Sequence, residues 1–314
     1  MIKYVGKRLF YAFLTILTLT ALTFFMMRLL PGDPFIGNKV IPEATLKALE
    51  AKYGLDKPVL QQFAIYVANV FKGDLGTSIK YTRPVTDIIA QAFPYSFELG
   101  IRALILATIA GVLIGIVAAV KRGTGWDSLT MLLAIIGVSV PNFVIGALLQ
   151  YYLGLKLFEW TGVKVFPIGG WDTFASKIMP AFALSFSSLA TISRLMRTSM
   201  LDVLGQDYIK TAKSKGLSQS KIIWRHAVRN AIMPVITVLG PLAASVLTGA
   251  FVVENIFSIP GMGKFFVMSI QDQDYTMISG ITLFYGIFLV LANLLVDLAY
   301  GFIDPRVKIT KGKE

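Results

Sequence analysis

Six long apolar runs divide the chain, and the segments between them are rich in polar and charged residues. Each run reaches or approaches the ~20 residues that a helix needs to cross the hydrocarbon core of a bilayer. The pattern therefore predicts an all-α polytopic membrane protein with six transmembrane helices. The expected spans are about 9–30, 99–120, 129–153, 178–196, 231–253 and 277–300.

The first run begins as a secretory signal does, because Lys3, Lys7 and Arg8 precede it. It continues for about 22 residues, which is too long for the apolar region of a cleaved signal peptide. No small-residue cleavage site precedes Pro31. We therefore expect a retained signal anchor that forms the first span.

The charge distribution orients the spans. Lys and Arg number seventeen against five acidic residues on one side, and eleven against eleven on the other. The basic side consists of segments 1–8, 121–128, 194–229 and 303–314, and the balanced side of 31–95, 154–177 and 254–276. The positive-inside rule places the basic side, with both termini, in the cytoplasm. Insertion and anionic lipid thus account for the net charge of +12 without nucleic acid.

Composition agrees with this class of protein. The mean hydropathy is +0.68 and 55% of the residues are hydrophobic, far above a soluble domain. Cysteine is absent from the sequence, which excludes disulfides and thiolate metal sites and says little about the compartment.

The first loop is long enough to form a small extracytoplasmic region of its own. Proline and glycine positions predict helices over 43–53 and 58–72, and a third short helix is expected after Pro84. A further surface helix is expected near 262–270. Packing on the outer ends of the spans is the simpler interpretation of these helices, and contact with a substrate or receptor is the alternative.

Small and charged residues within the spans predict contacts between helices. Glu98 and Arg102 lie one turn apart and can form an ion pair. Gly111 and Gly115 form a small-xxx-small pattern, which suits close approach of another helix. Asp297 is a candidate partner of Arg194 or Arg197, two hypotheses that stay open here.

A few polar or kinked positions could border a pathway. Pro141 interrupts the third span and favours a kink, although proline is common enough in membrane helices that ordinary packing explains it equally well. The fourth span is rich in small and hydroxyl residues, typical of a helix packed on all sides or bordering a polar cavity. The pathway candidates are Pro141, Asn142, Gln150, Ser185 and Ser188.

The segment 207–234 is the one basic cytoplasmic stretch with its own helical pattern. Asp207 is expected to cap a two-turn helix that carries Lys213 in its last turn and ends before Gly216. Ser218 is expected to cap a second helix, with Leu217 packing on Ile222 as a hydrophobic staple.

A helix of two turns is not stable by itself in water. Tyr208, Ile209 and Ala212 therefore need a surface to pack against. Lipid headgroups or the protein's own helix ends are the simpler candidates for that surface, and a groove in a soluble partner is the alternative.

Catalytic motifs find no support in the sequence. GMGK at 261–264 lacks the glycine and the Ser or Thr of a phosphate-binding loop, since Ser258 and Phe265 stand there. His226 is the single histidine and lies in the cytoplasmic arm. The spans also lack the central carboxylates of a proton-coupled carrier, so the energy for transport is expected to come from a partner.

Several motifs resemble one family of importers. TAKSKGL (211–217) and RHAVRNAIMP (225–234) are similar to the coupling loop of permease subunits in the peptide and nickel branch of ATP-binding-cassette (ABC) importers. Against the general family pattern only Ala212 and Gly216 match, and Lys210 replaces an acidic residue. RLLPGDP (28–34), YGLDKP (53–58), GDLGTS (73–78) and VDLAYGFIDPR (296–306) resemble the B-type subunit of oligopeptide and dipeptide permeases.

The resemblance implies a type I ABC importer permease fold and no catalysis by this chain. It implies peptide uptake powered by ATP and Mg on partner subunits, in the inner or plasma membrane of a bacterium or archaeon. The implied partners are a homologous second permease, two cytoplasmic ATPases and an extracytoplasmic peptide-binding protein. Alternatives are a permease for a nickel chelate or another small solute and, further off, a stand-alone carrier or channel.

The resemblance also assigns regions and residues. It implies an N-terminal tail and first helix (1–30), an extracytoplasmic region (31–95), a permease core (96–303) with a coupling loop (200–230), and a cytoplasmic tail (304–314). No metal or cofactor site is expected. The residues expected to contact the ATPase are Asp207, Tyr208, Ile209, Lys210, Thr211, Ala212, Lys213, Lys215, Gly216, Leu217, Ser218 and Ile222.

Overall fold

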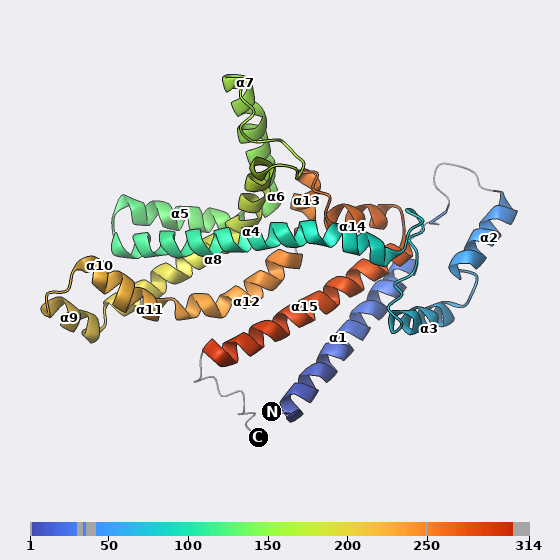
Figure 1. Cartoon of the computed structure of the whole chain (residues 1–314), viewed down its shortest axis with the longest axis horizontal. Helices are drawn as coiled ribbons and strands as arrows, with labels where there is room; N and C mark the ends of the chain where they lie inside the picture. The colour runs from blue at the N-terminus through green and yellow to red at the C-terminus, as the bar shows by residue number, and fades with distance from the viewer. Residues whose placement is uncertain (1, 30–33, 36–41, 249, 304–314) are drawn as a thin grey trace. The chain divides into compact units, whose positions relative to one another are not determined.

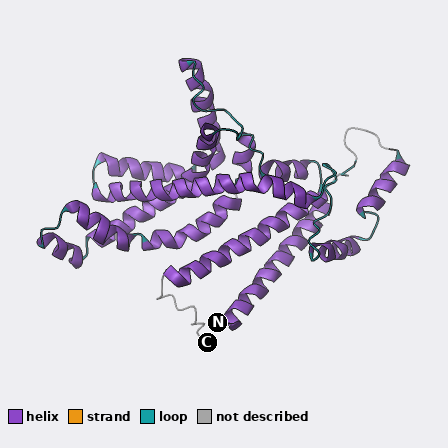
Figure 2. Ribbon diagram, in the orientation of Figure 1, coloured by secondary structure: helices purple, strands orange, loops and turns teal. Residues whose placement is uncertain are grey.

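The computed structural model describes residues 2–29, 34–35, 42–248 and 250–303, and its regular elements there are helices (Figure 2). The chain divides into two compact units. Unit 1 comprises Met1–Tyr95 and Gly261–Glu314, and unit 2 comprises Ser96–Pro260.

Unit 1 is built on two long antiparallel helices, α1 and α15, which pack along one another (Figure 1). Gly286 of α15 allows this approach, because a Cβ there would lie 2.8 Å from Leu19 of α1. Its helices are α1 (Ile2–Leu29), α2 (Glu43–Tyr53), α3 (Val59–Val70), the first part of α4 (Val85–Val120), α14 (Met262–Gln271) and α15 (Tyr275–Ile303).

Asp274 fastens the start of α15 to the loop before α4. Its buried carboxylate accepts hydrogen bonds from the Ser78 hydroxyl, from the Lys80 backbone N–H at 3.1 Å and from the Met277 N–H at 3.0 Å. The last of these bonds caps α15. A Cβ at Gly280 would lie 2.6 Å from Val85, so this end of the unit is closely packed.

Unit 2 is organised around α8, a long helix that packs against α5, α6 and α12. Its helices are the rest of α4, α5 (Gly125–Ser139), α6 (Asn142–Leu149), α7 (Leu157–Thr161), α8 (Phe174–Leu204), α9 (Asp207–Ser214), α10 (Gln219–Lys221), α11 (Val228–Ala231), α12 (Met233–Thr248) and α13 (Phe251–Ile256), with π-helical turns η1 (Gln150–Lys156) and η2 (Ile222–Ala227).

Glycine permits the contact between α4 and α8. A Cβ at Gly111 would lie 2.9 Å from Ile192, and one at Gly115 would lie 2.5 Å from the Ser193 carbonyl oxygen. Both distances are below van der Waals contact, so only glycine fits this interface. The predicted small-residue surface is confirmed, and its partner is α8.

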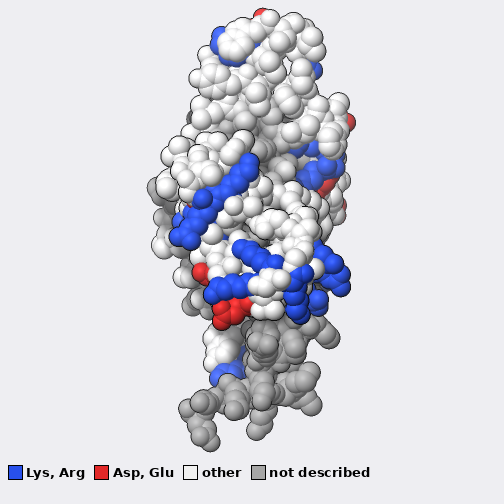
Figure 3. Space-filling model, turned by 90° about the vertical axis from the view of Figure 1, so that its left-hand side faces the viewer, with Lys and Arg blue, Asp and Glu red and all other residues white. Residues whose placement is uncertain are grey.

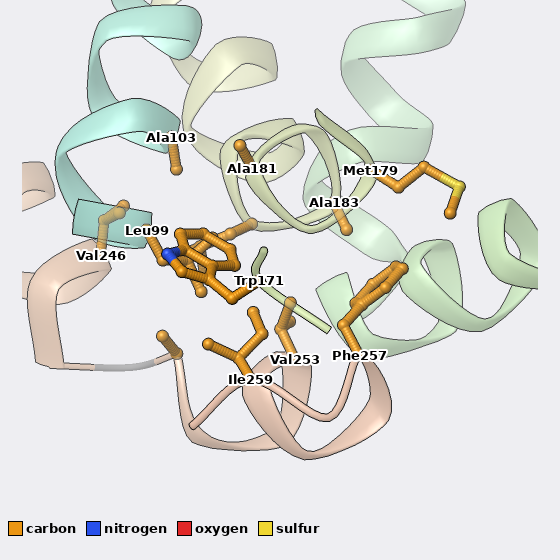
Figure 4. Close-up of a cluster of buried hydrophobic side chains, with 12 residues drawn as sticks. Leu99, Ala103, Trp171, Met179, Ala181, Ala183, Val246, Val253, Phe257 and Ile259 are labelled. Atoms are coloured by element: carbon orange, nitrogen blue, oxygen red, sulfur yellow. The ribbon is translucent and has the colours of Figure 1, made fainter. Parts of the chain in front are cut away.

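One core of unit 2 surrounds Trp171 (Figure 4). The indole ring lies among Leu99, Val253 and Ile259, and its N–H donates to Glu98 at 2.9 Å. Glu98 also accepts from Arg102, which confirms the predicted pair, and from Lys177. The carboxylate thus joins α4 to α8 and to the loop before it.

Among the described residues, four helices are long and apolar enough to cross a membrane, namely α1, α4, α8 and α15. Two further bent pairs bring the number to six if each pair is one span, which is the number that the sequence predicts. These pairs are Gly125–Ser139 with Asn142–Thr161, and Gln219–Ala231 with Met233–Leu247.

The kink expected at Pro141 is a sharp change of direction between two separate helices. The helical segments Gly125–Ser139 and Asn142–Thr161 are bent by 109° relative to one another. Val140 and Pro141 both have extended backbones, with ψ of 125° and 139°, so α5 ends before them and α6 begins after them. A residue before proline is disfavoured in helical geometry, which explains why the helix stops.

The outer helices agree with the sequence except in one place. α2, α3 and α14 cover the predicted ranges, and Gly54 ends α2 in a left-handed conformation. The expectation of a separate short helix after Pro84 is wrong, because α4 runs without a break from Val85 to Val120 through Pro94. An interior proline removes one backbone hydrogen bond, which a helix this long can lose without ending.

Candidate functional site

The basic corner of the coupling loop, residues 207–218, begins with helix α9. Gln206 occupies the N-cap position, and its carbonyl oxygen accepts the N–H groups of Ile209 and Lys210. The prediction that Asp207 caps the helix is therefore wrong by one residue. Its carboxylate pairs instead with Lys210 at 2.8 Å, an exposed contact that contributes little to stability.

The corner after α9 is a Schellman motif. Gly216 has φ of +75°, its N–H donates to the Lys213 carbonyl at 2.9 Å, and the Leu217 N–H donates to the Ala212 carbonyl at 3.3 Å. A left-handed residue at this position favours glycine. The predicted stop at Gly216 is confirmed, as is Ser218 at the N-cap position of the next helix.

One face of α9 packs on the protein's own helix ends. Ile209 and Ala212 are buried in a hydrophobic cluster, and Leu217 and Ile222 join it on the far side of the corner. This arrangement confirms the simpler interpretation of the surface that α9 needs. The other members of this cluster, here called the loop core, are Ala107, Ile116, Ala119, Ile192, Met196, Met200, Ala227, Ala231 and Val235.

The rest of the surface of α9 and of the corner after it, here called the open face, is exposed. Lys210, Thr211, Lys213 and Lys215 are exposed, and Figure 3 shows Lys and Arg side chains gathered on the side of the molecule where α9 and α10 lie in Figure 1. This surface is basic and can receive a partner with acidic groups.

Tyr208 is fixed at the edge of the open face. Its ring is 43% exposed, and its hydroxyl oxygen accepts a hydrogen bond from the Asn230 side chain at 2.9 Å. A tyrosine held in this way presents a rigid amphipathic surface to a partner. Sequence reasoning names Tyr208 and misses Asn230, since 22 residues separate the two.

Trp224 is a second exposed aromatic residue that the sequence prediction misses. It belongs to η2 and is 54% exposed, next to the basic residue Arg225. Tryptophan is enriched at protein interfaces. Its position between basic residues in KIIWRHAVRN is the signal that could have found it.

The loop core connects α9 to the long helices. Met196 and Met200 come from α8, Ala119 from α4 and Val235 from α12, and all are buried. Because packed side chains transmit displacement with little compression, a movement of α9 would carry the ends of these helices with it.

Arg197 forms an ion pair with Asp127 beside the loop core. It donates two hydrogen bonds to Asp127, at 2.6 and 2.8 Å, and Asp127 also accepts the Gly123 N–H at 3.0 Å. The forked geometry joins α8 to the first turn of α5, and the bond from Gly123 holds the turn before α5 to the same carboxylate. Arg197 thus has Asp127 as a partner that the sequence analysis did not name. The hypothesis that Asp297 pairs with Arg194 or Arg197 falls on a side chain outside the described residues.

The pathway candidates are held by internal contacts in this chain. The Gln150 amide donates to the carbonyls of Ile168 and Ile256, at 2.7 and 3.0 Å, and thereby fastens two loops. Ser185 is buried and donates to the carbonyl of Phe182, in its own helix. Ser188 is buried as well.

Asn142 and Pro141 stand at the turn between α5 and α6. The Asn142 amide approaches the Leu184 carbonyl at 3.4 Å, and its buried oxygen has no partner among the described residues. Pro141 is exposed. Of the five candidates, these two lie together, and the Asn142 side-chain oxygen is a polar atom without a partner among the described residues.

Comparison with known families decides the identity of the fold. Residues 111–309 match the family model described as "Binding-protein-dependent transport system inner membrane component". The chain belongs to this family. Residues 1–100 match a second model, described as "Binding-prot-dependent transport system membrane comp, N-term". The chain is therefore a multi-pass membrane permease and a non-catalytic subunit, as the sequence predicts.

Relatives with assigned names are similar over the whole length. The chain is 47% identical over 312 residues to the dipeptide transport system permease protein DppB of Bacillus subtilis (strain 168), covering 99% of both chains. It is 40% identical to the oligopeptide transport system permease protein OppB of Haemophilus influenzae, covering 98% of this chain and 100% of the other.

A solved structure supports the fold. The crystal structure of an amino acid ABC transporter with histidines aligns with a TM-score of 0.51 at 14% identity, over 71% of this chain and 96% of the other. The type I ABC importer permease fold expected from the sequence agrees with this alignment. At such low identity the likeness concerns the fold alone.

Proposed function

We propose that this chain is the permease subunit of an ABC importer that takes up dipeptides or oligopeptides. The cargo class is inferred from full-length similarity to permeases named for dipeptide and oligopeptide transport, at 47% and 40% identity. A nickel chelate or another small solute is the second candidate cargo, because the sequence motifs are shared with that branch.

The cargo is tested with the reconstituted importer and its binding protein. Uptake of a radiolabelled dipeptide into proteoliposomes is expected to be saturable, and unlabelled di- and tripeptides should compete for it. A nickel chelate should leave the uptake unchanged. If the chelate competes and the peptides do not, the cargo assignment is wrong while the permease assignment stands.

In the proposed complex, a second homologous permease completes the pathway and two ATPases bind at the cytoplasmic side. The open face of α9, with Lys213 and the fixed ring of Tyr208, is the contact for one ATPase. ATP and Mg are bound by the ATPases rather than by this chain. An extracytoplasmic peptide-binding protein delivers the cargo, consistent with the description of the family.

Transmission follows from the packing beneath α9. Closure of the ATPases on ATP displaces α9, and the loop core carries that displacement into α8 through Met196 and Met200. The pathway then opens outward to receive peptide, and hydrolysis resets it. Gly216, with its left-handed backbone, maintains the sharp corner between α9 and the next helix, so that both helices move together.

Cysteine crosslinking tests the contact, and the sequence suits it because it contains no native cysteine. Thr211→Cys and Lys213→Cys place thiols on the open face, whereas Ile209→Cys places one in the loop core as a buried control. We expect the first two to crosslink to cysteines in a co-expressed ATPase and Ile209→Cys not to. Crosslinking from position 209 alone would contradict the proposed face.

A further inference from the structure

A cavity of about 320 Å³ lies within unit 1. It is bounded by the end of α1, by α3, by the end of α2 with the loop after it, and by the start of α15. The permease function described above assigns no role to it. Its volume is at the low end of small-molecule sites.

Three cations line this cavity, namely Arg28, Lys52 and Lys57, and none of the described residues that line it is acidic. Salt bridges found within the described residues do not include any of the three. A cavity with several cations and no carboxylate favours an anion.

Arg28 is oriented by its neighbours and retains donors. Its guanidinium lies 3.4 Å from the centre of the Phe24 ring, and Gln62 and the Phe24 carbonyl accept three of its N–H groups. Arginine has five such donors. Two have no acceptor among the described residues, on a group that is already held in place, and could bind a ligand.

Two hydroxyl groups of the lining residues are unsatisfied. The oxygen atoms of Tyr66 and Ser279 are buried and have no hydrogen-bond partner among the described residues. Burial raises the pKa of Tyr66, so its phenol stays protonated and able to donate. A buried hydroxyl without a partner is costly, and an oxygen-rich ligand would remove that cost.

The surface around the cavity is apolar. Met26 and Leu29, in the last turn of α1, are 64% and 82% exposed, and Leu60 and Phe71, in and beside α3, are each 74% exposed. α1 is long and apolar enough to span a membrane. With the N-terminus in the cytoplasm, as the charge distribution predicts, its last turn lies near the outer boundary of the bilayer. A short helix with apolar side chains at that depth is typical of an interfacial helix.

We propose that this cavity binds the phosphate-bearing headgroup of an anionic phospholipid. Arg28 and Lys57 neutralise the phosphate, and Tyr66 donates to a headgroup oxygen. The acyl chains lie along the exposed side of α1, where Met26 and Leu29 contact them. A lipid bound in this way links α3 to the end of α1. This site shares no residue with the proposed ATPase contact.

The test uses the purified importer complex in detergent and native mass spectrometry to measure binding of dioctanoyl-phosphatidylglycerol. Lys57→Gln should lower the affinity for the tightest-bound lipid molecule about tenfold, as expected for loss of one charged hydrogen bond. Tyr66→Phe should lower it about fivefold, as expected for loss of one neutral hydrogen bond. Both changes are small, and the rate of ATP hydrolysis by the complex reports whether each variant is assembled.

Lys72→Gln is the matched control. Lys72 follows α3, is exposed and lies outside the cavity lining, so its loss removes the same charge from the same surface. Lipid binding by this variant should equal that of the unchanged protein. Equal weakening in Lys72→Gln and Lys57→Gln would mean diffuse surface attraction and would overturn the proposal.

Two further ligands separate lipid from other anions. Dioctanoyl-phosphatidylcholine, which has no net charge, should bind at least tenfold more weakly than phosphatidylglycerol. Glycerol 3-phosphate should not displace the bound lipid at the same concentration, because it lacks the acyl chains. If glycerol 3-phosphate displaces it equally well, the site binds a soluble anion and the lipid assignment is wrong.

Discussion

Gly216 determines the direction in which the chain leaves α9. Its φ of +75° is open to an L-residue only at a cost, and no atom lies within 4 Å of the position that a Cβ would take. Gly216→Ala should therefore strain the backbone by about 1 kcal/mol without any steric clash. We expect ATPase co-purification to fall severalfold while the amount of membrane-inserted permease is unchanged.

Gly205→Ala provides the comparison for this prediction. Gly205 also ends a helix of the coupling loop, but its φ is −79° and a Cβ would make only ordinary contacts at 3.6 Å. Its substitution should leave ATPase co-purification intact. Equal losses in both variants would show that the loop is merely sensitive to alanine, and that the left-handed corner has no special part in docking.

The Asp127–Arg197 pair makes a second prediction at this scale. Asp127→Asn removes the charge that Arg197 faces across 2.6 Å and leaves a largely buried guanidinium without a counterion. We expect the free energy of unfolding to fall by about 2 kcal/mol, measured as a lower thermal midpoint of the purified complex. Adding Arg197→Gln should restore part of that loss.

An exposed ion pair offers the control. Glu43 and Lys47 pair at 2.8 Å on α2, but both side chains are more than two-thirds exposed. Glu43→Gln should leave the thermal midpoint unchanged, because surface pairs contribute little. A midpoint for Asp127→Asn that matches Glu43→Gln would mean that the fork is not a structural contact.

Single residues were predictable where their signal is local. Gly216 and Ser218 sit beside the helix ends that they define, so the sequence around them is sufficient. Asp127 and Asn230 were not found, because their partners lie 70 and 22 positions away. Long-range pairing depends on how helices pack, and residue type alone does not specify that.

At the scale of the element, α9 has a buried face that packs on the loop core and an exposed face that we propose binds the ATPase. Ile209→Ala empties part of the loop core and should destabilise the protein by about 3 kcal/mol. Lys213→Ala changes only the exposed side and should leave the thermal midpoint unchanged while lowering peptide-stimulated ATP hydrolysis. Thermal unfolding and ATPase rate, measured on both variants, separate the two effects.

The opposite result for α9 would be informative. If Lys213→Ala left the ATPase rate unchanged and Tyr208→Ala did so too, the open face would have no partner there. The helix would then serve only to close the end of unit 2, the simpler interpretation that its burial already supports.

The α4–α8 contact gives the next prediction. A Cβ at Gly115 would lie 2.5 Å from the Ser193 carbonyl oxygen, a backbone atom that cannot turn away as a side chain does. Gly115→Ala should therefore push the helices apart and lower the free energy of unfolding by about 2 kcal/mol. Gly125→Ala is the control, since the space around that position is open.

Elements were predictable in number and type more than in shape. Apolar length identifies a segment that can cross the membrane, and this places all six candidate spans. It does not distinguish a kink from a turn, so the 109° bend at Pro141 was underestimated. It also places the start of α4 too late, because the helix continues beyond the apolar run toward Val85.

At the scale of the whole molecule, the sequence supports transport and supplies no source of energy. Family membership makes the chain a permease. Its basic corner carries exposed lysines and a tyrosine ring that Asn230 holds by a hydrogen bond, and these features support the proposed ATPase contact. The proposed peptide cargo rests on the names of relatives and not on any pocket described above. The proposed substrate class therefore rests on sequence similarity, whereas the proposed transmission of movement from α9 to α8 rests on the structure.

This division leads to a prediction for reconstituted vesicles. Permease purified without partners should give no peptide uptake, with or without ATP, whereas the assembled importer with its binding protein should accumulate peptide only when ATP is supplied on the ATPase side. An ion-coupled carrier or channel would behave differently, since the chain alone would admit peptide without ATP. Uptake by the single chain that responds to an imposed proton gradient would contradict the dependence on a partner, and with it the role proposed for α9.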